Sequence, residues 1–213
     1  MTRGAFISLE GGEGVGKSTN LAFTADAVRR AGFDVVTTRE PGGTELGERI
    51  RGWILGGDHG KLSAEVEALL MFAARARHLD EVIRPALESG KWVVCDRFTD
   101  ATFAYQGGGR GVSRALLDTL KTEIEKGTEP DLTLLLDAPL DVGASRIGGR
   151  ELDHFEREQR PFFERVRAAY LDLAARYPSR IKIVDASAPL CEVQRRIGEH
   201  VAALVERFGD RQR

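Results

Sequence analysis

GGEGVGKS at residues 11–18 has the spacing of a phosphate-binding loop. It follows a short apolar run typical of a strand, residues 4–10, and precedes an amphipathic helical pattern from residue 17. Glycines at these positions let backbone N–H groups turn toward a polyphosphate at the positive end of the next helix. Lys17 is then expected to reach the β- and γ-phosphates, and the Ser18 hydroxyl to bind Mg²⁺. The alternative is a plain turn that binds nothing.

Length and composition favour one α/β domain that binds small molecules. The chain has 213 residues, of which 31 are basic and 33 acidic, giving a formal net charge of −2. Such a balance argues against general attraction to nucleic acid or to an anionic membrane. Cys95 and Cys191 lack metal-ligand or C-x-x-C spacing, and the histidines show no metal spacing either. We see no signal peptide and no apolar run of membrane-spanning length, and therefore expect a cytoplasmic protein.

Short apolar runs alternate with longer helical patterns along the chain. Strands are predicted at residues 4–10, 34–38, 91–96, 131–137 and 180–185, and helices at residues 17–31, 44–55, 63–88, 114–126, 140–147, 153–175 and 189–207. This alternation predicts a five-stranded parallel sheet flanked by helices, in a single domain over residues 1–213. Ligands bind outside the carboxyl ends of such strands, so the residues just after each strand are the candidates for function.

Charged residues follow two of the predicted strands. Asp96 could hold Mg²⁺ through water and Arg97 could clamp a second phosphate, although such a pair also suits a solvated turn. Asp137 is a rival acid for the metal, unless it only precedes a helix that starts near Pro139.

Two glycine-containing segments also come after strands. REPGGT at residues 39–44 offers Arg39 and two glycines to an anion, or a turn into a helix capped by Thr44. YQGGGRG at residues 105–111 has three consecutive glycines. Ordering glycines on folding costs conformational entropy, and a segment that only connects two elements would not need them, which favours a functional role. The alternative is a flexible surface loop.

Two further segments could contact a ligand. Phe72 and Arg75 lie three residues apart on one helix face, where an aromatic plate and a cation could meet one ligand, although the face could simply be core. A lid at about residues 146–156, hinged at Gly148-Gly149, could bring Arg146 and Arg150 over a transferring phosphoryl group. Solvated helix faces have a similar density of charge.

Together these segments resemble the bacterial thymidylate kinases over essentially the whole chain. The motifs that carry the resemblance are LEGGEGVGKST at 9–19, TREPGGT at 38–44, MFAARARH at 71–78, DRF at 96–98, YQGGGRG at 105–111, PDLTLLLD at 130–137 and RELDHFE at 150–156. The resemblance implies a P-loop NTPase-type sheet like that of nucleoside monophosphate kinases, and transfer of the γ-phosphoryl group of Mg-ATP to dTMP, giving dTDP, in a homodimer. Because Gly14 stands where some relatives carry a catalytic arginine, the chain resembles the class whose arginine comes from the lid.

The resemblance also implies roles for individual residues. Glu13 would touch the 3′-hydroxyl of dTMP, and Tyr105 would press beneath its sugar where a ribose 2′-hydroxyl would clash. Phe72 would stack on thymine. The residues implied to bind ATP are Gly11, Gly12, Glu13, Gly14, Val15, Gly16, Lys17, Ser18 and Thr19. Those implied to bind dTMP are Glu13, Arg39, Phe72, Arg75, Arg97, Thr102, Tyr105 and Gln106. The implied metal ligands are Ser18 and Asp96, and the implied catalytic residues are Lys17, Arg97, Arg146 and Arg150.

Two positions depart from the family pattern. The stacking aromatic often lies four residues before the arginine, where this chain has Met71, so that either Met71 or Phe72 could cover the base. Gly149 stands where a lid arginine is expected, which leaves Arg146 and Arg150 as candidates. Alternative functions are another nucleoside monophosphate or deoxynucleoside kinase on the same scaffold, or a nucleotide-dependent switch. No N-K-x-D motif is present, which argues against a GTPase.

Overall fold

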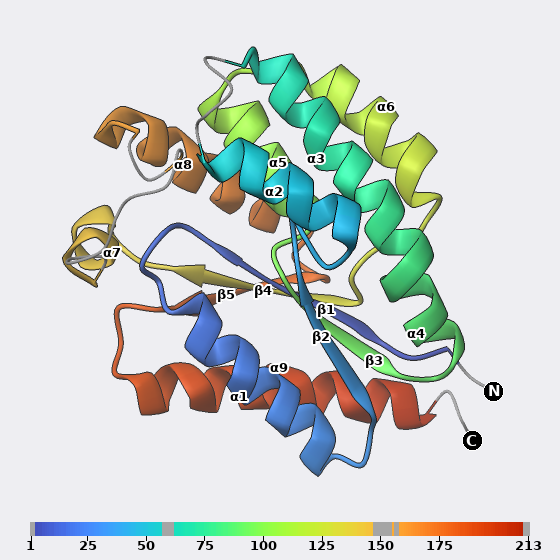
Figure 1. Cartoon of the computed structure of the whole chain (residues 1–213). Coiled ribbons are helices and arrows are strands. Elements are labelled where there is room, and N and C mark those ends of the chain that lie inside the picture. Colours follow the sequence, from blue (N-terminus) through green and yellow to red (C-terminus); the bar gives the residue numbers. More distant parts are fainter. Residues whose placement is uncertain (1–2, 57–61, 147–154, 156–157, 211–213) are drawn as a thin grey trace.

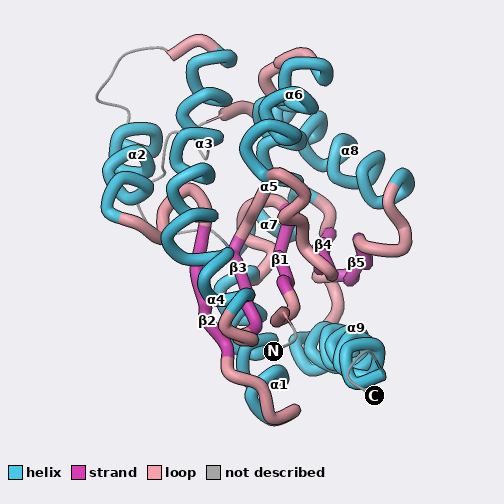
Figure 2. Tube along the Cα trace, turned by 90° about the vertical axis from the view of Figure 1, so that its right-hand side faces the viewer, coloured by secondary structure: helices cyan, strands magenta, loops and turns pink. Residues whose placement is uncertain are grey.

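Five parallel strands form the centre of the computed structural model, which describes residues 3–56, 62–146, 155 and 158–210 (Figure 1). The strands are β1 (Phe6–Gly11), β2 (Val35–Arg39), β3 (Trp92–Asp96), β4 (Leu132–Asp137) and β5 (Ile181–Asp185). Their order across the sheet is β2-β3-β1-β4-β5 (Figure 2). All four neighbouring pairs are parallel, which confirms the predicted sheet.

Helices cover both faces of this sheet. The helices α1 (Lys17–Arg30) and α9 (Leu190–Asp210) pack on one face (Figures 1 and 2). The other side carries α2 (Glu45–Gly56), α3 (Ala64–His78), α4 (Arg84–Glu88), α5 (Thr99–Thr102), α6 (Arg114–Glu125) and α8 (Arg160–Arg176). The short α7 (Leu140–Arg146) lies beyond the carboxyl end of β4. In the described part of the chain, no helix is both long and apolar enough to cross a membrane.

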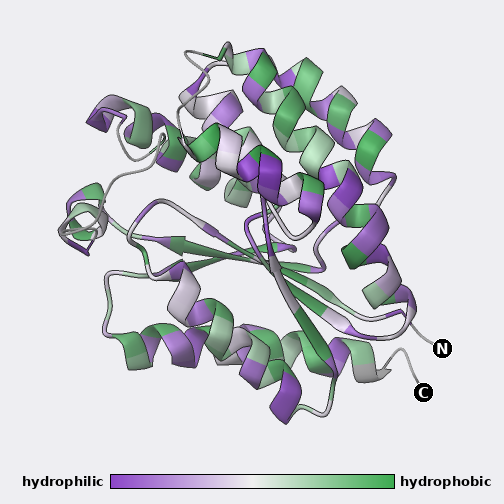
Figure 3. Ribbon diagram, viewed as in Figure 1, coloured by the Kyte–Doolittle hydropathy of each residue, from purple (hydrophilic) through white to green (hydrophobic). Residues whose placement is uncertain are grey.

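Apolar strands hold the layers together. All six residues of β1, the central strand, are buried, and the strands are mainly hydrophobic (Figure 3). Ile7 and Leu9 point to the cluster under α1 and α9, whereas Phe6 joins a second cluster against α4. Each fully buried aliphatic side chain contributes about 1.5–3 kcal/mol to folding. The strand that precedes the phosphate loop is therefore firmly anchored.

The predicted helix over residues 63–88 is divided into three parts. Between α3 and α4 lies a π-helical segment, η1 (Leu79–Ile83), and Pro85 stands in the first turn of α4. Proline has no N–H to donate to the helical ladder, so the hydrogen-bond pattern changes just before it.

The glycine-rich segment after α5 is helical, so the interpretation as a flexible surface loop is wrong. Residues Phe103–Gly109 form a π-helical segment, η2, which packs against α8. A Cβ atom on Gly108 would lie 2.5 Å from the Ala169 Cβ atom, and one on Gly109 would lie 2.4 Å from the Phe162 ring. The glycines are needed because two helical backbones approach closely there.

The predicted helix over residues 153–175 begins later, at Arg160. Phe155, Glu158 and Gln159 are not helical, and Pro161 occupies the first turn of α8, a position that proline favours. Of the lid predicted at about residues 146–156, residues 147–154 and 156 lie outside the described residues. Arg150 and the Gly148-Gly149 pair are among them.

Candidate active site

A hollow of about 500 Å³ opens at the carboxyl ends of the central strands. It is lined by the phosphate loop and by residues from α2, α3, η2 and α7. The predicted residues that line it are Glu13, Gly14, Gly16, Lys17, Ser18, Thr19, Arg75, Asp96, Arg97, Thr102, Tyr105, Gln106 and Arg146. Segments more than 130 residues apart in sequence, such as those of Glu13 and Arg146, thus meet at one place, as expected for a site outside parallel strands.

The phosphate loop has the conformation that its glycines predict. Gly14 and Gly16 have positive φ angles of 70° and 86°, and Gly16 caps the start of α1 without offering a side-chain acceptor to the first turn. The buried Lys17 ammonium donates hydrogen bonds to the carbonyl oxygens of Gly11, at 3.2 Å, and Gly12, at 2.6 Å. Burial, followed by the nearby Arg97 charge, lowers the pKa of Lys17. The loop therefore places an amino group and a helix N-terminus where a polyphosphate could bind.

Arg97 is held in the hollow by several polar groups. Its Nη2 atom donates to the Glu13 carboxylate, at 2.5 Å, and to the Tyr105 hydroxyl, at 3.0 Å, while its Nη1 atom donates to the Gly11 carbonyl, at 3.1 Å. The Tyr105 hydroxyl also donates to Glu13, at 2.7 Å. Arg97 has a φ angle of 66°, an unusual value for a residue with a side chain. The cluster fixes a cation beside the phosphate loop.

Glu10 stabilises the backbone next to Arg97 through buried hydrogen bonds. Its Oε1 atom accepts a hydrogen bond from the Phe98 N–H group, at 2.7 Å, and its Oε2 atom accepts one from the Tyr170 hydroxyl, at 2.9 Å. Tyr170 in turn lies 3.3 Å from Arg97 Nη1. Burial, followed by the charge of Asp100, raises the pKa of Glu10 from 4.5 to about 8.

Asp96 and Ser18 line the same hollow and have the chemistry of a magnesium site. The Asp96 Oδ1 atom is buried and has no hydrogen-bond partner in the described part of the chain. A buried carboxylate oxygen without a donor is costly, and a hydrated cation would satisfy it. The rival acid, Asp137, accepts two hydrogen bonds from Arg167, at 2.7 and 2.8 Å, and does not line this hollow.

Arg75 also lines the hollow and is almost fully buried. Its Nε atom donates to Glu40, at 2.7 Å, and its Nη2 atom donates to Thr102, at 2.9 Å. The guanidinium lies 4.7 Å from the Phe72 ring centre and 5.1 Å from that of Phe98. Its Nη1 atom is buried without a hydrogen-bond partner among the described residues. One donor is thus left for an acceptor on a ligand.

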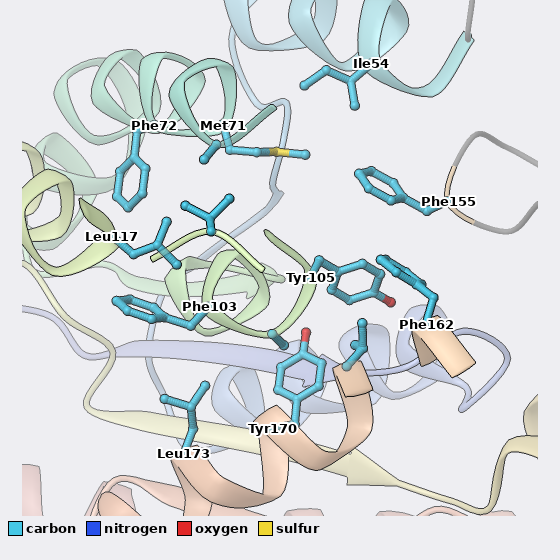
Figure 4. Packing of buried hydrophobic residues seen from close by; sticks show 14 of the residues in the cluster. Ile54, Met71, Phe72, Phe103, Tyr105, Leu117, Phe155, Phe162, Tyr170 and Leu173 are labelled. Atoms are coloured by element: carbon cyan, nitrogen blue, oxygen red, sulfur yellow. The ribbon is translucent and has the colours of Figure 1, made fainter. Parts of the chain in front are cut away.

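Met71 and Phe72 lie differently with respect to this hollow. Met71 lines the hollow, whereas Phe72 is only 1% exposed and does not line it. Figure 4 shows Met71 pointing toward Phe155 and Phe72 pointing toward Leu117 in the core. Phe72 contacts the Arg75 guanidinium, but only Met71 reaches the surface of the hollow.

Arg39 does not line the hollow, and a cation that the sequence reasoning missed does. Arg39 donates to Glu48, at 2.8 Å, and is half exposed. Arg51 lines the hollow and donates to the Pro41 carbonyl, at 3.1 Å. Arg51 shares the helix face of the buried residues 47, 50 and 54, and a charged residue on a buried face is the signal that could have found it. The predicted cap of the same helix is confirmed, since the Gly47 N–H group donates to the Thr44 hydroxyl, at 3.0 Å.

Behind the loop, a second hollow of about 330 Å³ lies between the loop, β4, α7 and α8. Gly11, Gly12 and Val15 line this second hollow and not the first. Arg146, at the end of α7, lines the first hollow and donates to the Ala186 carbonyl, at 3.0 Å.

Comparison with known proteins agrees with this geometry. Residues 9–197 match the family model described as thymidylate kinase. The thymidylate kinase of Methylococcus capsulatus is 54% identical over 206 residues, covering 96% of this chain and 98% of that protein. The thymidylate kinase of Pseudomonas putida is 53% identical over 205 residues, with the same coverage. A crystal structure of the Ehrlichia chaffeensis thymidylate kinase superposes with a TM-score of 0.76 at 29% identity, covering 95% of this chain and 99% of that one. Near-complete coverage at this identity, over a sheet and a phosphate loop of the expected kind, means that the chain belongs to the thymidylate kinase family.

Proposed function

We propose that this protein transfers the γ-phosphoryl group of ATP to the 5′-phosphate of dTMP, giving dTDP. The observation that carries the proposal is that one hollow is lined both by a phosphate loop and by a buried arginine with a spare donor. Family membership supports the choice of acceptor.

ATP is proposed to bind at residues 11–19. Backbone N–H groups of the loop and the N-terminus of α1 would hold its phosphates, and the Lys17 ammonium would exchange the Gly11 and Gly12 carbonyls for β- and γ-phosphate oxygens. Asp96 and Ser18 would hold Mg²⁺, which would neutralise charge between the β- and γ-phosphates when bound.

The acceptor is proposed to enter from the side of α3 and η2. Arg75 would donate its free Nη1 group to a thymine carbonyl, with Thr102 and Gln106 beside it. Met71 has the accessible surface to cover the base, while Phe72 would act through the guanidinium that it supports. Glu13 and Tyr105 would contact the sugar, and Arg97 and Arg51 would hold the phosphate, with Arg39 at the rim.

Catalysis would rest on positioned cations. The transferring phosphoryl group passes through a loose transition state whose charge lies on its equatorial oxygens, so that little covalent help is needed. Lys17 and Arg97 both line the hollow, and Arg146 is the candidate lid-side arginine within the described residues.

A homodimer is part of this proposal. Leu46 and Trp53 share one face of α2, and Val66 and Leu69 share one face of α3; all four side chains are between 39% and 49% exposed. Because α2 and α3 pack side by side, a second copy could cover both faces (Figure 1). A cytoplasmic location is also proposed, since the described thiols of Cys95 and Cys191 are both unpaired, as is usual in a reducing compartment.

Acceptor-dependent ADP release tests the proposal. Purified protein is mixed with ATP, Mg²⁺ and dTMP, dAMP, dCMP or thymidine, and ADP is measured by a coupled assay. We expect ADP only with dTMP and a divalent cation. Lys17→Ala should lower kcat by about 10³-fold, while the exposed control Lys91→Ala leaves it unchanged. Preference for another acceptor, ADP release without acceptor, or normal turnover in Lys17→Ala would each refute the proposed reaction.

A further inference from the structure

The backbone of α7 lies directly against the phosphate loop, with no side chain between them. A Cβ atom on Gly143 would lie 2.5 Å from the Glu13 carbonyl oxygen, and a Cβ atom on Gly14 would lie 2.1 Å from the Gly143 carbonyl oxygen. Both distances are far below van der Waals contact, so the approach requires glycine on both sides. Nothing else about the helix favours Gly143, since alanine is better by about 1 kcal/mol inside a helix.

The same helix carries a cation into the hollow. Arg146 lies three residues after Gly143, so the two share one face of α7. Arg146 lines the hollow together with Gly14 and Lys17, and its Nη1 atom donates to the Ala186 carbonyl. The distance between α7 and the loop therefore sets how far this guanidinium reaches toward the phosphate site.

We propose that Gly143 is a positioning residue, and that its contact with the loop fixes Arg146 at the depth needed for phosphoryl transfer. This inference rests on the reaction proposed above. A methyl group at Gly143 would overlap with the Glu13 carbonyl oxygen, and α7 would have to move by about 1 Å to remove this overlap. A shift of that size at a reacting centre lowers the rate by about 100-fold.

The two partners in this contact differ in how easily they can move. The loop is held between the fully buried strand β1 and helix α1, whereas α7 has only seven residues at the edge of the fold. The helix and its arginine should therefore move, rather than the loop.

A double-mutant cycle tests this inference. Gly143→Ala should lower kcat by about 100-fold with little change in dTMP affinity measured by calorimetry, and with a melting temperature within about 5 °C of that of the wild type. Gly52→Ala, in a helix where a Cβ atom would meet nothing within 4 Å, is the matched control and should leave kcat unchanged. In the Arg146→Ala background, Gly143→Ala should change kcat by less than about threefold, because the residue through which it acts is gone.

Three results would overturn the inference. The first is wild-type kcat in Gly143→Ala, and the second is a full loss that persists in the Arg146→Ala background. The third is a large drop in melting temperature, because the contact would then serve folding and not position. Absence of dTMP-dependent turnover in the wild type is a different failure, since it refutes the proposed reaction itself.

Discussion

Replacing Glu10 with glutamine is expected to remove a large part of the pH dependence of folding stability. The Glu10 carboxyl group is fully buried at the end of β1, where it accepts hydrogen bonds from the Phe98 N–H group and the Tyr170 hydroxyl. Glutamine has the same shape, its oxygen can accept from Phe98, and its amide can donate to the tyrosine oxygen. The substitution therefore removes the titration while keeping the packing.

The size of the effect follows from the pKa. Burial raises the pKa of Glu10 from 4.5 to about 8, so between these values the folded chain holds a proton that the unfolded chain has released. The free energy of unfolding then falls as pH rises, by up to about 1.4 kcal/mol per pH unit and about 5 kcal/mol in all. This contribution is complete below about pH 4.5 and is lost above about pH 8. Glu10→Gln has no such proton to lose.

Urea unfolding of both proteins at several values between about pH 5 and pH 9 measures this difference. Relative to the wild type, Glu10→Gln should gain stability as pH rises and reach a plateau above about pH 8. Replacement of the exposed carboxylate, Glu65→Gln, serves as the control and should give a curve parallel to that of the wild type. If the Glu10→Gln curve is also parallel, Glu10 is ionised in the folded protein and the reasoning is refuted.

Two further substitutions test the packing and the assembly. Gly108→Ala should lower the free energy of unfolding by about 1–3 kcal/mol in urea titrations, because its methyl group would overlap with Ala169, and equal stability would contradict the close packing of η2 on α8. Leu69→Glu should convert the proposed dimer into a folded monomer in analytical ultracentrifugation, because a charge on the exposed face of α3 cannot be buried against a second copy. If Leu69→Glu is still a dimer, the interface lies elsewhere on the surface. Leu190→Glu, at an exposed position of α9, is the control and should leave the dimer unchanged.

The phosphate loop could be predicted from sequence because all of its determinants are local. Glycine spacing, the preceding apolar strand and the following helix lie within about 25 consecutive residues, and each has a pattern of its own. The sheet could be predicted only in part. The alternation of strands and helices predicts a parallel sheet, but it does not predict which strands are neighbours. Asp96 and Arg97 line the same hollow as the phosphate loop, as expected for parallel strands that end at one edge, whereas Arg39 and Asp137 do not line it.

The buried hydrogen bonds and ion pairs that hold the site residues in place could not be predicted, because the paired residues are far apart in sequence. Glu10 and Tyr170 are separated by 160 positions, and nothing near either residue in the sequence points to the other. Arg75 is recognisable as a cation on a helix, but its buried carboxylate partner, Glu40, lies 35 residues earlier in a turn. Side-chain orientation in such pairs is decided by tertiary packing, on which a single sequence carries little information.

Glycine is the residue type for which a sequence-based interpretation is most ambiguous in this chain. Gly16 is required by a left-handed backbone, which the loop motif predicts locally. Gly108 and Gly143 are required instead by a neighbour, Ala169 or the Glu13 carbonyl, from which they are separated by 61 and 130 residues. Read locally, each of these two glycines indicates flexibility. In the structure, another segment fills the space that a side chain would occupy at each of these two glycines. Each glycine therefore adds rigidity and not flexibility, because it lets two elements approach closely and so fixes the distance between them.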